Sequence, residues 1–333
     1  MSGWAAGVLR SRTCWLTLLP LAMSLLLGGA FWRPANLQDL VSALAIEGIM
    51  CVGMTIVMVA GGFDLSIGSV LALAGVIVVS FETSGLPAAM SIALLVSGLA
   101  GLANGVLVGV LRINPFIATL STMVIVRALA LIYTGSEPVS GADLRLMELT
   151  RSVLAGVPAI GLVALVLAAL GHCMMTRLRI GREIHALGSN EAAARASGVG
   201  TVRLKILCYV LCSLCAGIAG IVLAGRLNTG SPVIGEHAAL NVIAAVLLGG
   251  TSLSGGVGTI WGSLAGLLAI GALENMMRIL DVPAYSQRIL QGGLLLAIVV
   301  ADRLGDKRIA RRFPIFANLA KTNRNKGDLG GEE

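Results

Sequence analysis

Residues 61–69 have the sequence GGFDLSIGS, which places an acid, two serines and three glycines between two apolar runs. VGMTIVMVA precedes this stretch and VLALAGVIVV follows it. Glycine lets the backbone leave helical geometry, so the stretch predicts a break between two apolar helices. Why an acid stands at that break depends on the surroundings that the rest of the chain predicts.

Composition identifies those surroundings as a membrane. The chain has 333 residues, of which 56% are hydrophobic and 12% are charged, whereas a soluble domain carries about 25% charged residues. The apolar runs are continuous and rich in Leu, Val and Ala, and helical spans need about 20 such residues. A β-barrel would instead show short alternating segments. We therefore expect an all-α integral membrane protein, a polytopic bundle of about ten helices.

The expected spans cover most of the chain. The first has Arg10 and Arg12 before it and no A-x-A site after it, so we expect a retained span rather than a cleaved signal peptide. Two runs are short and begin or end at glycine, which predicts half-helices or re-entrant segments; they are 65–81 and 238–250. The other runs are 14–32, 38–60, 87–111, 115–134, 153–175, 204–224, 259–277 and 286–301.

Charge predicts the orientation. The formal net charge is +7, and most basic residues fall in the N-terminus, in the loop 176–205 and in the tail 303–333. Short basic loops between apolar runs follow the positive-inside rule, which favours a membrane protein over a nucleic-acid-binding one. The expected domains are a cytoplasmic N-terminus (1–13), a permease domain (14–302) with the cytoplasmic loop 176–205, and a basic, disordered cytoplasmic tail (303–333). The loop 135–152, with Asp143 and Glu148, is placed outside.

The glycine-rich stretch has an internal echo. GGTSLSGGV at 249–257 shares Gly-Gly, Leu-Ser and a later glycine with GGFDLSIGS. Paired glycine-interrupted segments in two halves of a transporter point to its substrate path. We therefore predict a repeat, with a translocation path or broken-helix region formed by Gly61, Gly62, Asp64, Ser66, Gly68, Asn104, Gly249, Gly250, Ser252 and Ser254.

Asp64 has two compatible roles. An acid at membrane depth costs roughly 2.5–3.5 kcal/mol on insertion scales unless it is paired or wetted. It can N-cap the helix 65–81, or it can line a polar pathway, and the sequence favours neither. Glu47 and Arg127 are further charges inside spans; they can form a buried pair, or each can face the bundle interior or snorkel separately.

Other reactive residues show no catalytic pattern. The spacing of Cys208, Cys212 and Cys215 puts three thiols on one helical stripe, but no histidine lies beside them, so we expect small hydrophobes and no metal site. His172, His185 and His237 are scattered. Neither a Ser/His/Asp order nor a GxxxxGK[ST] phosphate loop occurs in the chain. We expect no catalytic residues, no bound cofactor and no ATPase site in this chain.

The basic loop contains SNEAAARASG at 189–198. Ser189 or Asn190 can cap a helix there, with Glu191 in its first turn and Gly198 at its end. We expect a short helix outside the membrane. It is either an ordinary surface loop or a docking helix for a cytoplasmic partner.

Four stretches carry a family resemblance: GGFDLSIGSVLALAGV, NGVLVGVLRINPFIATLSTMVIVRALAL, ALGSNEAAARASGV and IAAVLLGGTSLSGGVGTIWGSLAGLLAIGAL. In this order and spacing they resemble the permease subunit of bacterial ABC importers for monosaccharides. The ribose, xylose and galactose permeases are the nearest type, and the autoinducer-2 permease is a relative. The resemblance covers roughly residues 38–302.

The resemblance implies a permease in the bacterial inner membrane, with a second copy completing a homodimeric or heterodimeric pore in the lipid bilayer. It implies a periplasmic sugar-binding protein that delivers substrate and a cytoplasmic ABC ATPase subunit that uses ATP; nucleic acid has no part. It also implies that 181–200 is the coupling segment, whose EAA-G pattern is matched by Glu191, Ala192, Ala193 and Gly198.

Some positions depart from the family pattern and leave the substrate open. Ala239 and Asn241 replace acids before IAAV, Ala128 replaces a glycine, and Glu274-Asn275-Met276 replaces Asn-Asn-Gly. These positions are expected at the pore or the dimer contact. A permease for branched-chain amino acids or autoinducer-2 is an alternative. An ion-driven transporter, coupled through intramembrane acids, is a more distant one.

Overall fold

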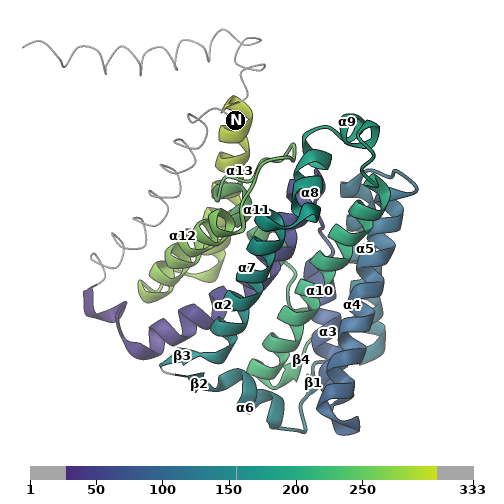
Figure 1. Ribbon diagram of the computed structural model, residues 1–333. Helices are drawn as coiled ribbons and strands as arrows, with labels where there is room; N and C mark the ends of the chain where they lie inside the picture. The colour runs from purple at the N-terminus through teal and green to yellow at the C-terminus, as the bar shows by residue number, and fades with distance from the viewer. Residues whose placement is uncertain (1–27, 155, 306–333) are drawn as a thin grey trace, which may run out of the picture. The chain divides into compact units, whose positions relative to one another are not determined.

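The computed structural model describes residues 28–154 and 156–305 and is almost entirely helical (Figure 1). The chain divides into a unit that ends at Pro283 and a unit that begins at Ala284. The helices of the first unit are η1 (Gly28–Ala30), α2 (Pro34–Val59), α3 (Ile67–Ser80), η2 (Glu82–Ser84), α4 (Leu86–Gly109), α5 (Pro115–Thr134), α6 (Arg145–Arg151), α7 (Ala159–Arg177), α8 (Arg179–Ser189), α9 (Glu191–Ala196), α10 (Thr201–Leu227), α11 (Ala238–Leu248) and α12 (Ile260–Ile279).

The expected helical membrane fold is confirmed. Helices α2, α4, α5, α7, α10 and α12 are long and apolar enough to cross a membrane. Helices α3 and α11 are short, as their flanking glycines predict. With 14 residues, α3 extends only about 21 Å, against a hydrocarbon thickness of about 30 Å. Residues 14–27 of the first expected span lie outside the described residues.

Helix α10 packs against α2, α3 and α4. Its contact with α3 is close enough to involve the backbone: a Cβ added to Gly220 would lie 2.2 Å from the carbonyl oxygen of Leu71. Helices in lipid gain stability from such close packing, because lipid gives them little hydrophobic drive to associate. The core of this unit is therefore built around α3 and α10, and α3 is buried along most of its length.

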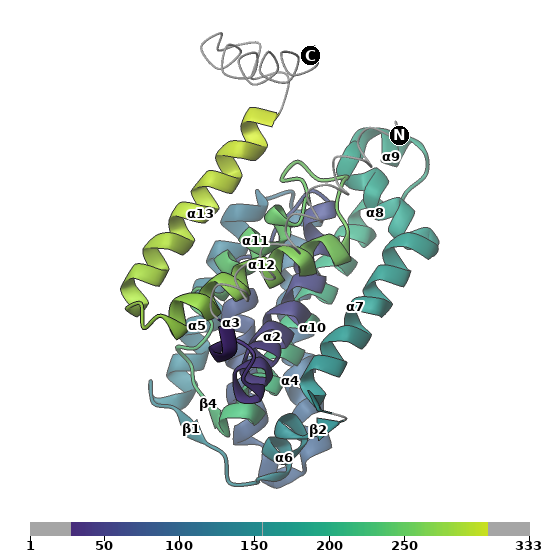
Figure 2. The same cartoon turned by 90° about the vertical axis from the view of Figure 1, so that its left-hand side faces the viewer.

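The two ends of the first unit differ (Figures 1 and 2). Helices α8 and α9 lie at one end, and α6 lies at the other with four short strands. Strand β1 (Val139–Ser140) pairs with β4 (Thr229–Gly230), and β2 (Val153–Leu154) pairs with β3 (Val157–Pro158), both antiparallel. The expected span 153–175 therefore begins too early. Gly156, with φ +83°, turns this hairpin, and the helix starts only after Pro158.

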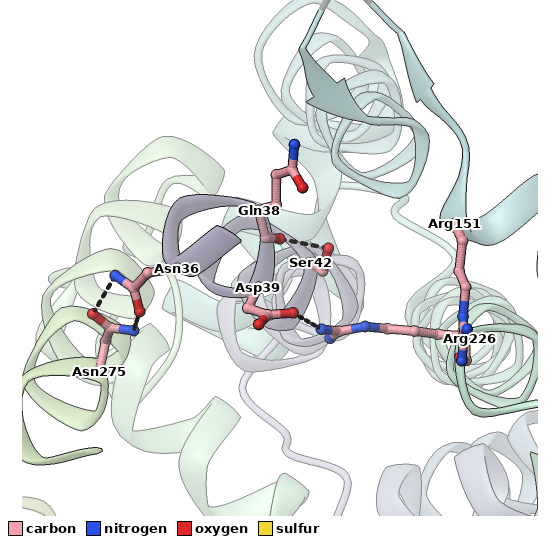
Figure 3. Close-up of polar contacts among 7 residues, drawn as sticks. All are labelled: Asn36, Gln38, Asp39, Ser42, Arg151, Arg226 and Asn275. Atoms are coloured by element: carbon pink, nitrogen blue, oxygen red, sulfur yellow. Dashed lines mark hydrogen bonds and ion pairs between the residues drawn. The ribbon is translucent and has the colours of Figure 1, made fainter. Parts of the chain in front are cut away.

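Polar side chains tie α2 to its neighbours near the end that carries the strands (Figure 3). Asn36 and Asn275 exchange side-chain hydrogen bonds of 3.1 and 2.8 Å that join α2 to α12. Asp39 pairs with Arg226 of α10 at 2.8 Å. Asn275 is only 1% exposed. The middle residue of the Glu274-Asn275-Met276 stretch, an asparagine as in the family pattern, therefore fastens two helices of the same chain.

The second unit contains α13 (Ala284–Gly305). This helix includes the expected last span, 286–301, and continues into the segment that we assigned to the tail. The expected cytoplasmic N-terminus, 1–13, lies outside the described residues, as does the tail from residue 306.

Candidate functional site

Asp64 is fully buried between α2 and α3. Its Oδ1 accepts hydrogen bonds from the Ser66 amide at 2.8 Å and from the Ser66 hydroxyl at 2.6 Å. The side-chain amide of Asn104, on α4, donates to both carboxylate oxygens, at 3.2 and 3.3 Å. Buried carboxylates are tolerated where donors replace the lost water. Asp64 thus organises the turn that enters α3 and ties that turn to α4.

Helix α10 closes the other side of this network. The Tyr209 hydroxyl donates to the Phe63 carbonyl oxygen at 3.4 Å, and a Cβ on Gly62 would lie 2.6 Å from that hydroxyl. The N-cap residue of α3 is Ser66, so Asp64 does not itself cap the helix; it holds the turn before the helix through the Ser66 amide and hydroxyl. Its role in a translocation pathway stays a prediction. Sequence reasoning missed Tyr209, which resembles any other apolar-helix tyrosine until its neighbours are known.

The two glycine-rich stretches end their preceding helices in the same way. Gly61, with φ +87°, follows α2, and Gly250, with φ +91°, follows α11. In each case the left-handed glycine and the next residue donate amide hydrogen bonds to carbonyls three and five positions back, which is the Schellman cap. The backbone matches Gly61 with Gly250, whereas the sequence echo matches Gly61 with Gly249.

Beyond this cap the two stretches differ. The second loop continues to Thr259, whose hydroxyl caps α12 by accepting from the Gly262 amide at 3.1 Å. Its serines form a local turn: the hydroxyls of Ser252 and Ser254 lie 2.9 Å apart, and Ser254 is exposed. The second loop has no acid at the position that Asp64 occupies in the first loop. The echo therefore describes a shared helix end and not a second copy of the buried network.

The two loops meet each other and α8. The Gly256 amide of the second loop donates to the Val59 carbonyl at the end of α2, at 2.8 Å. Gly188 of α8 packs so closely that an added Cβ would lie 1.8 Å from that same Val59 oxygen. His185 Nδ1 lies 3.0 Å from the Gly256 carbonyl oxygen. Helix α8 is therefore fastened to both glycine-rich loops, and sequence reasoning, which left His185 unassigned, missed this joint.

The short helix expected in the basic loop is α9, and α8 is an additional helix before it. Asn190 caps α9 by accepting from the Ala193 amide at 3.0 Å. Glu191 pairs with Arg195 at 2.8 Å and with Lys205 of α10 at 2.7 Å. The Lys205 hydrogen bond holds the pKa of Glu191 below its usual range, so this carboxyl is ionised at neutral pH. The pair of Glu191 and Lys205 fastens α9 to the N-terminal part of α10.

The exposed residues of α9 are alanines and Arg195. Ala192 and Ala193 are exposed and Ala194 is buried. Gly198, with φ +83°, follows the end of the helix, and a Cβ there would meet no atom within 4 Å. A cavity of about 310 Å³ lies behind α9, with Gly61, Arg112, Glu191, Lys205 and Tyr209 among its lining residues. It separates the first glycine-rich loop from α9.

Of the two alternatives for Glu47 and Arg127, the buried pair does not form. Arg127 Nη1 donates to the carbonyls of Pro232 and Ile234, at 2.8 Å for Ile234. Glu47, on α2, lies near Glu274 of α12 and hydrogen-bonds to the side chain of Asn241 on α11. Each charge faces its own neighbours, as the alternative supposed. Sequence places a charge on a helix but does not say which helix it faces.

The cysteine stripe belongs to the packing. Cys208 and Cys212 of α10 are fully buried, and Cys212 abuts Gly53 of α2. In the described ranges, 28–154 and 156–305, no three His, Cys, Asp or Glu side chains come close enough to hold a metal ion.

The chain is similar to a protein family and to characterised transport proteins. Residues 36–299 match the family described as branched-chain amino acid transport system / permease component. The chain is 36% identical to the ribose import permease protein RbsC of Bacillus subtilis (strain 168), with 84% of this chain and 88% of the relative covered. It is 39% identical to RbsC of Escherichia coli (strain K12), covering 82% and 87%. It is 40% identical to the L-arabinose transport system permease protein AraH of the same strain, covering 82% and 84%.

Proposed function

The chain belongs to the permease family of ABC importers, and from this membership we propose that it carries a monosaccharide across the inner membrane. Ribose and arabinose permeases are 36% to 40% identical to it over most of both chains, and this observation carries the proposal. The six long apolar helices within residues 28–154 and 156–305 make it a multi-pass membrane protein. We propose a pentose or a related sugar as substrate, delivered by a periplasmic binding protein.

The remaining parts of such an importer lie outside this chain. A cytoplasmic ATPase would use ATP and dock at α8 and α9, where the small exposed face of Ala192 and Ala193 can enter a groove. A second permease copy would complete the pore. If α8 and α9 lie on the cytoplasmic side, both termini are cytoplasmic as well. The binding protein then approaches the opposite end of the first unit, where α6 and the short strands lie.

Helix α8 connects the proposed docking site to both glycine-rich loops. Its residue Gly188 touches the end of α2, and His185 touches the loop that leads to α12. A displacement of α8 and α9 by the ATPase therefore acts on both glycine-rich loops together. Since these loops lead into α3 and α12, motion would pass from the cytoplasmic face into the centre of the helix bundle.

Replacing Gly198 by proline tests the coupling segment. Gly198 has φ +83° and its amide donates to the Arg195 carbonyl at 3.0 Å, whereas proline holds φ near about −65° and has no amide hydrogen. We expect the variant to insert normally and to lose about tenfold or more of its ATP-driven uptake, because a strained exit of roughly 1–3 kcal/mol displaces α9. Uptake in proteoliposomes and membrane level are the measurements.

Gly200→Pro is the matched control, since Gly200 has φ −74° and ψ 71°, a conformation that proline accepts. We expect this variant to keep uptake near the wild-type rate. If Gly198→Pro also transported normally at normal membrane levels, the coupling role of this segment would have to be abandoned.

The class and the substrate are tested together. The chain would be co-expressed with its ATPase and binding protein, reconstituted in nanodiscs, and assayed for ATP hydrolysis with pentoses, hexoses and branched-chain amino acids. We expect one sugar-loaded binding protein to stimulate hydrolysis. Stimulation by an amino acid would mean that the substrate is a branched-chain amino acid, the solute named in the family description, and not a sugar. Uptake that depends on a proton gradient at constant ATP would favour an ion-driven transporter.

A further inference from the structure

A cavity of about 420 Å³ lies between α3, α5 and the loop that precedes α11. Its polar lining consists of Ser69, Arg127 and Glu236, and its remaining lining residues are Met123, Val124, Ala128, Leu131 and Val233. Small-molecule sites usually occupy about 300–1,000 Å³, with mostly apolar walls and a few polar groups. Size and lining both suit a small polar ligand.

Ser69 supplies an independent observation. Its side chain is fully buried, and its hydroxyl has no hydrogen-bond partner among the described residues. Helix serines commonly return their hydroxyl to the carbonyl four residues back, as Ser97 does at 2.7 Å. Buried polar groups in native proteins are nearly always paired. An unpaired hydroxyl beside a cavity is explained most simply by a ligand that completes its bonding.

The loop carrying Glu236 is held against Ser69 by backbone contact. A Cβ on Gly68 would lie 2.1 Å from the carbonyl oxygen of Gly235, so α3 and the loop touch directly. Arg127 fixes the same loop from α5 by donating to two of its carbonyls. Glu236 is exposed and interacts electrostatically with Arg127. A hydroxyl, a cation and an anion thus converge on one space from three elements.

We propose that this cavity is a contact site for the sugar inside the membrane path, with Ser69 and Glu236 bonding to sugar hydroxyls beside Arg127. The inference rests on the proposed function and adds a site to it. Sugar hydroxyls both donate and accept, and the three side chains offer both kinds of partner. The apolar walls contain no aromatic ring, which keeps binding weak. Weak binding suits transit, since a solute that enters a path must also leave it.

Ser69→Ala is the decisive variant, because its structural and functional consequences have opposite signs. A hydroxyl without a partner adds no bond to the fold, so its removal leaves thermal stability equal or higher. Loss of a bond to the sugar lowers uptake by about fivefold. The assay measures uptake of D-ribose and, separately, L-arabinose into proteoliposomes with saturating binding protein. Ser97→Ala, a buried serine on α4 that lies outside the cavity lining, is the control and should transport normally.

The outcomes separate the site from the function. Uptake within twofold of wild type for Ser69→Ala would overturn the site, and so would a fall in uptake that accompanies a fall in thermal stability. If the wild-type complex imports neither sugar and its ATPase ignores both, the proposed function fails and the site falls with it. Wild-type uptake with an unaffected Ser69→Ala variant removes the site alone.

A second measurement does not depend on the serine. In a background with Cys14 and Cys173 replaced by alanine, Ala128→Cys places a thiol in the cavity wall, and Ile132→Cys places one on the same helix outside the lining. We expect D-ribose or L-arabinose, at high millimolar concentration, to slow maleimide labelling at position 128 by severalfold and to leave position 132 unchanged. Equal rates at position 128 with and without sugar would count against the site.

Discussion

Replacing Asp64 by alanine is expected to abolish most uptake and to lower the free energy of unfolding by about 3 kcal/mol or more. The substitution leaves the Ser66 amide and the Ser66 hydroxyl without their acceptor, and leaves the Asn104 side-chain amide only the Ser66 hydroxyl oxygen, 2.9 Å away. These donors are buried, and each unsatisfied buried group costs about 1–3 kcal/mol. The entry into α3 would then lose its turn, and only the Ser66 hydroxyl would still tie it to Asn104 of α4.

Asp64→Asn distinguishes shape from charge. An asparagine keeps one acceptor for Ser66 but points an amide at the amide of Asn104, so we expect an intermediate loss. Asp39→Ala is the control acid, because Asp39 is 67% exposed and an exposed ion pair contributes about 0–1 kcal/mol. Thermal melting in detergent and uptake in proteoliposomes measure both effects. Normal uptake by Asp64→Ala at a normal membrane level would remove Asp64 from any account of the path.

Replacing Gly188 by alanine is expected to uncouple ATP hydrolysis from uptake, with at least about a tenfold fall in sugar imported per ATP. The new methyl group would lie 1.8 Å from the Val59 carbonyl oxygen, and that oxygen also accepts the Gly256 amide. Overpacking of this kind costs typically about 1–3 kcal/mol and shifts backbone. Helix α8 would move away from both glycine-rich loops while α9 keeps its exposed face.

Gly200→Ala is the matched control, in the segment between α9 and α10. A Cβ on Gly200 would meet no atom within 4 Å, and its φ of −74° suits alanine. We expect this variant to couple normally. Gly188→Ala protein that retained the wild-type ratio of sugar to ATP would show that the contact between α8 and α2 transmits nothing.

Local properties of the sequence predicted the helices well. The span expected at 115–134 is α5, with the same bounds, because Asn114 and Pro115 begin it and Gly135 ends it. Asn190 capped α9 as expected. Such features depend on a few neighbouring residues, so hydropathy, caps and glycines report them directly. The error at 153–158 has a local cause as well: a short hairpin of apolar residues is indistinguishable in hydropathy from a helix start.

The candidate site was predicted only in part. The stretch GGFDLSIGS predicted the first loop, and EAAARASG predicted α9. The contacts that hold these segments in place come from residues distant in the sequence, which the motifs do not predict. Asn104 and Tyr209 reach Asp64 from α4 and α10. The sequence left open whether Glu47 and Arg127 pair, because a charge on one helix can face any of several neighbours.

The sequence by itself determined that the chain is a helical membrane protein, where most of its helices lie, and which family it resembles. These properties follow from apolar length, charge between spans and short ordered motifs. Only the tertiary structure decided that α8 joins both glycine-rich loops, that Asp64 is enclosed, and that Ser69 stands unpaired beside a cavity. Each of these depends on which helix faces meet, and in a membrane those faces are selected by close packing of small residues, whose partners no single stretch of sequence specifies.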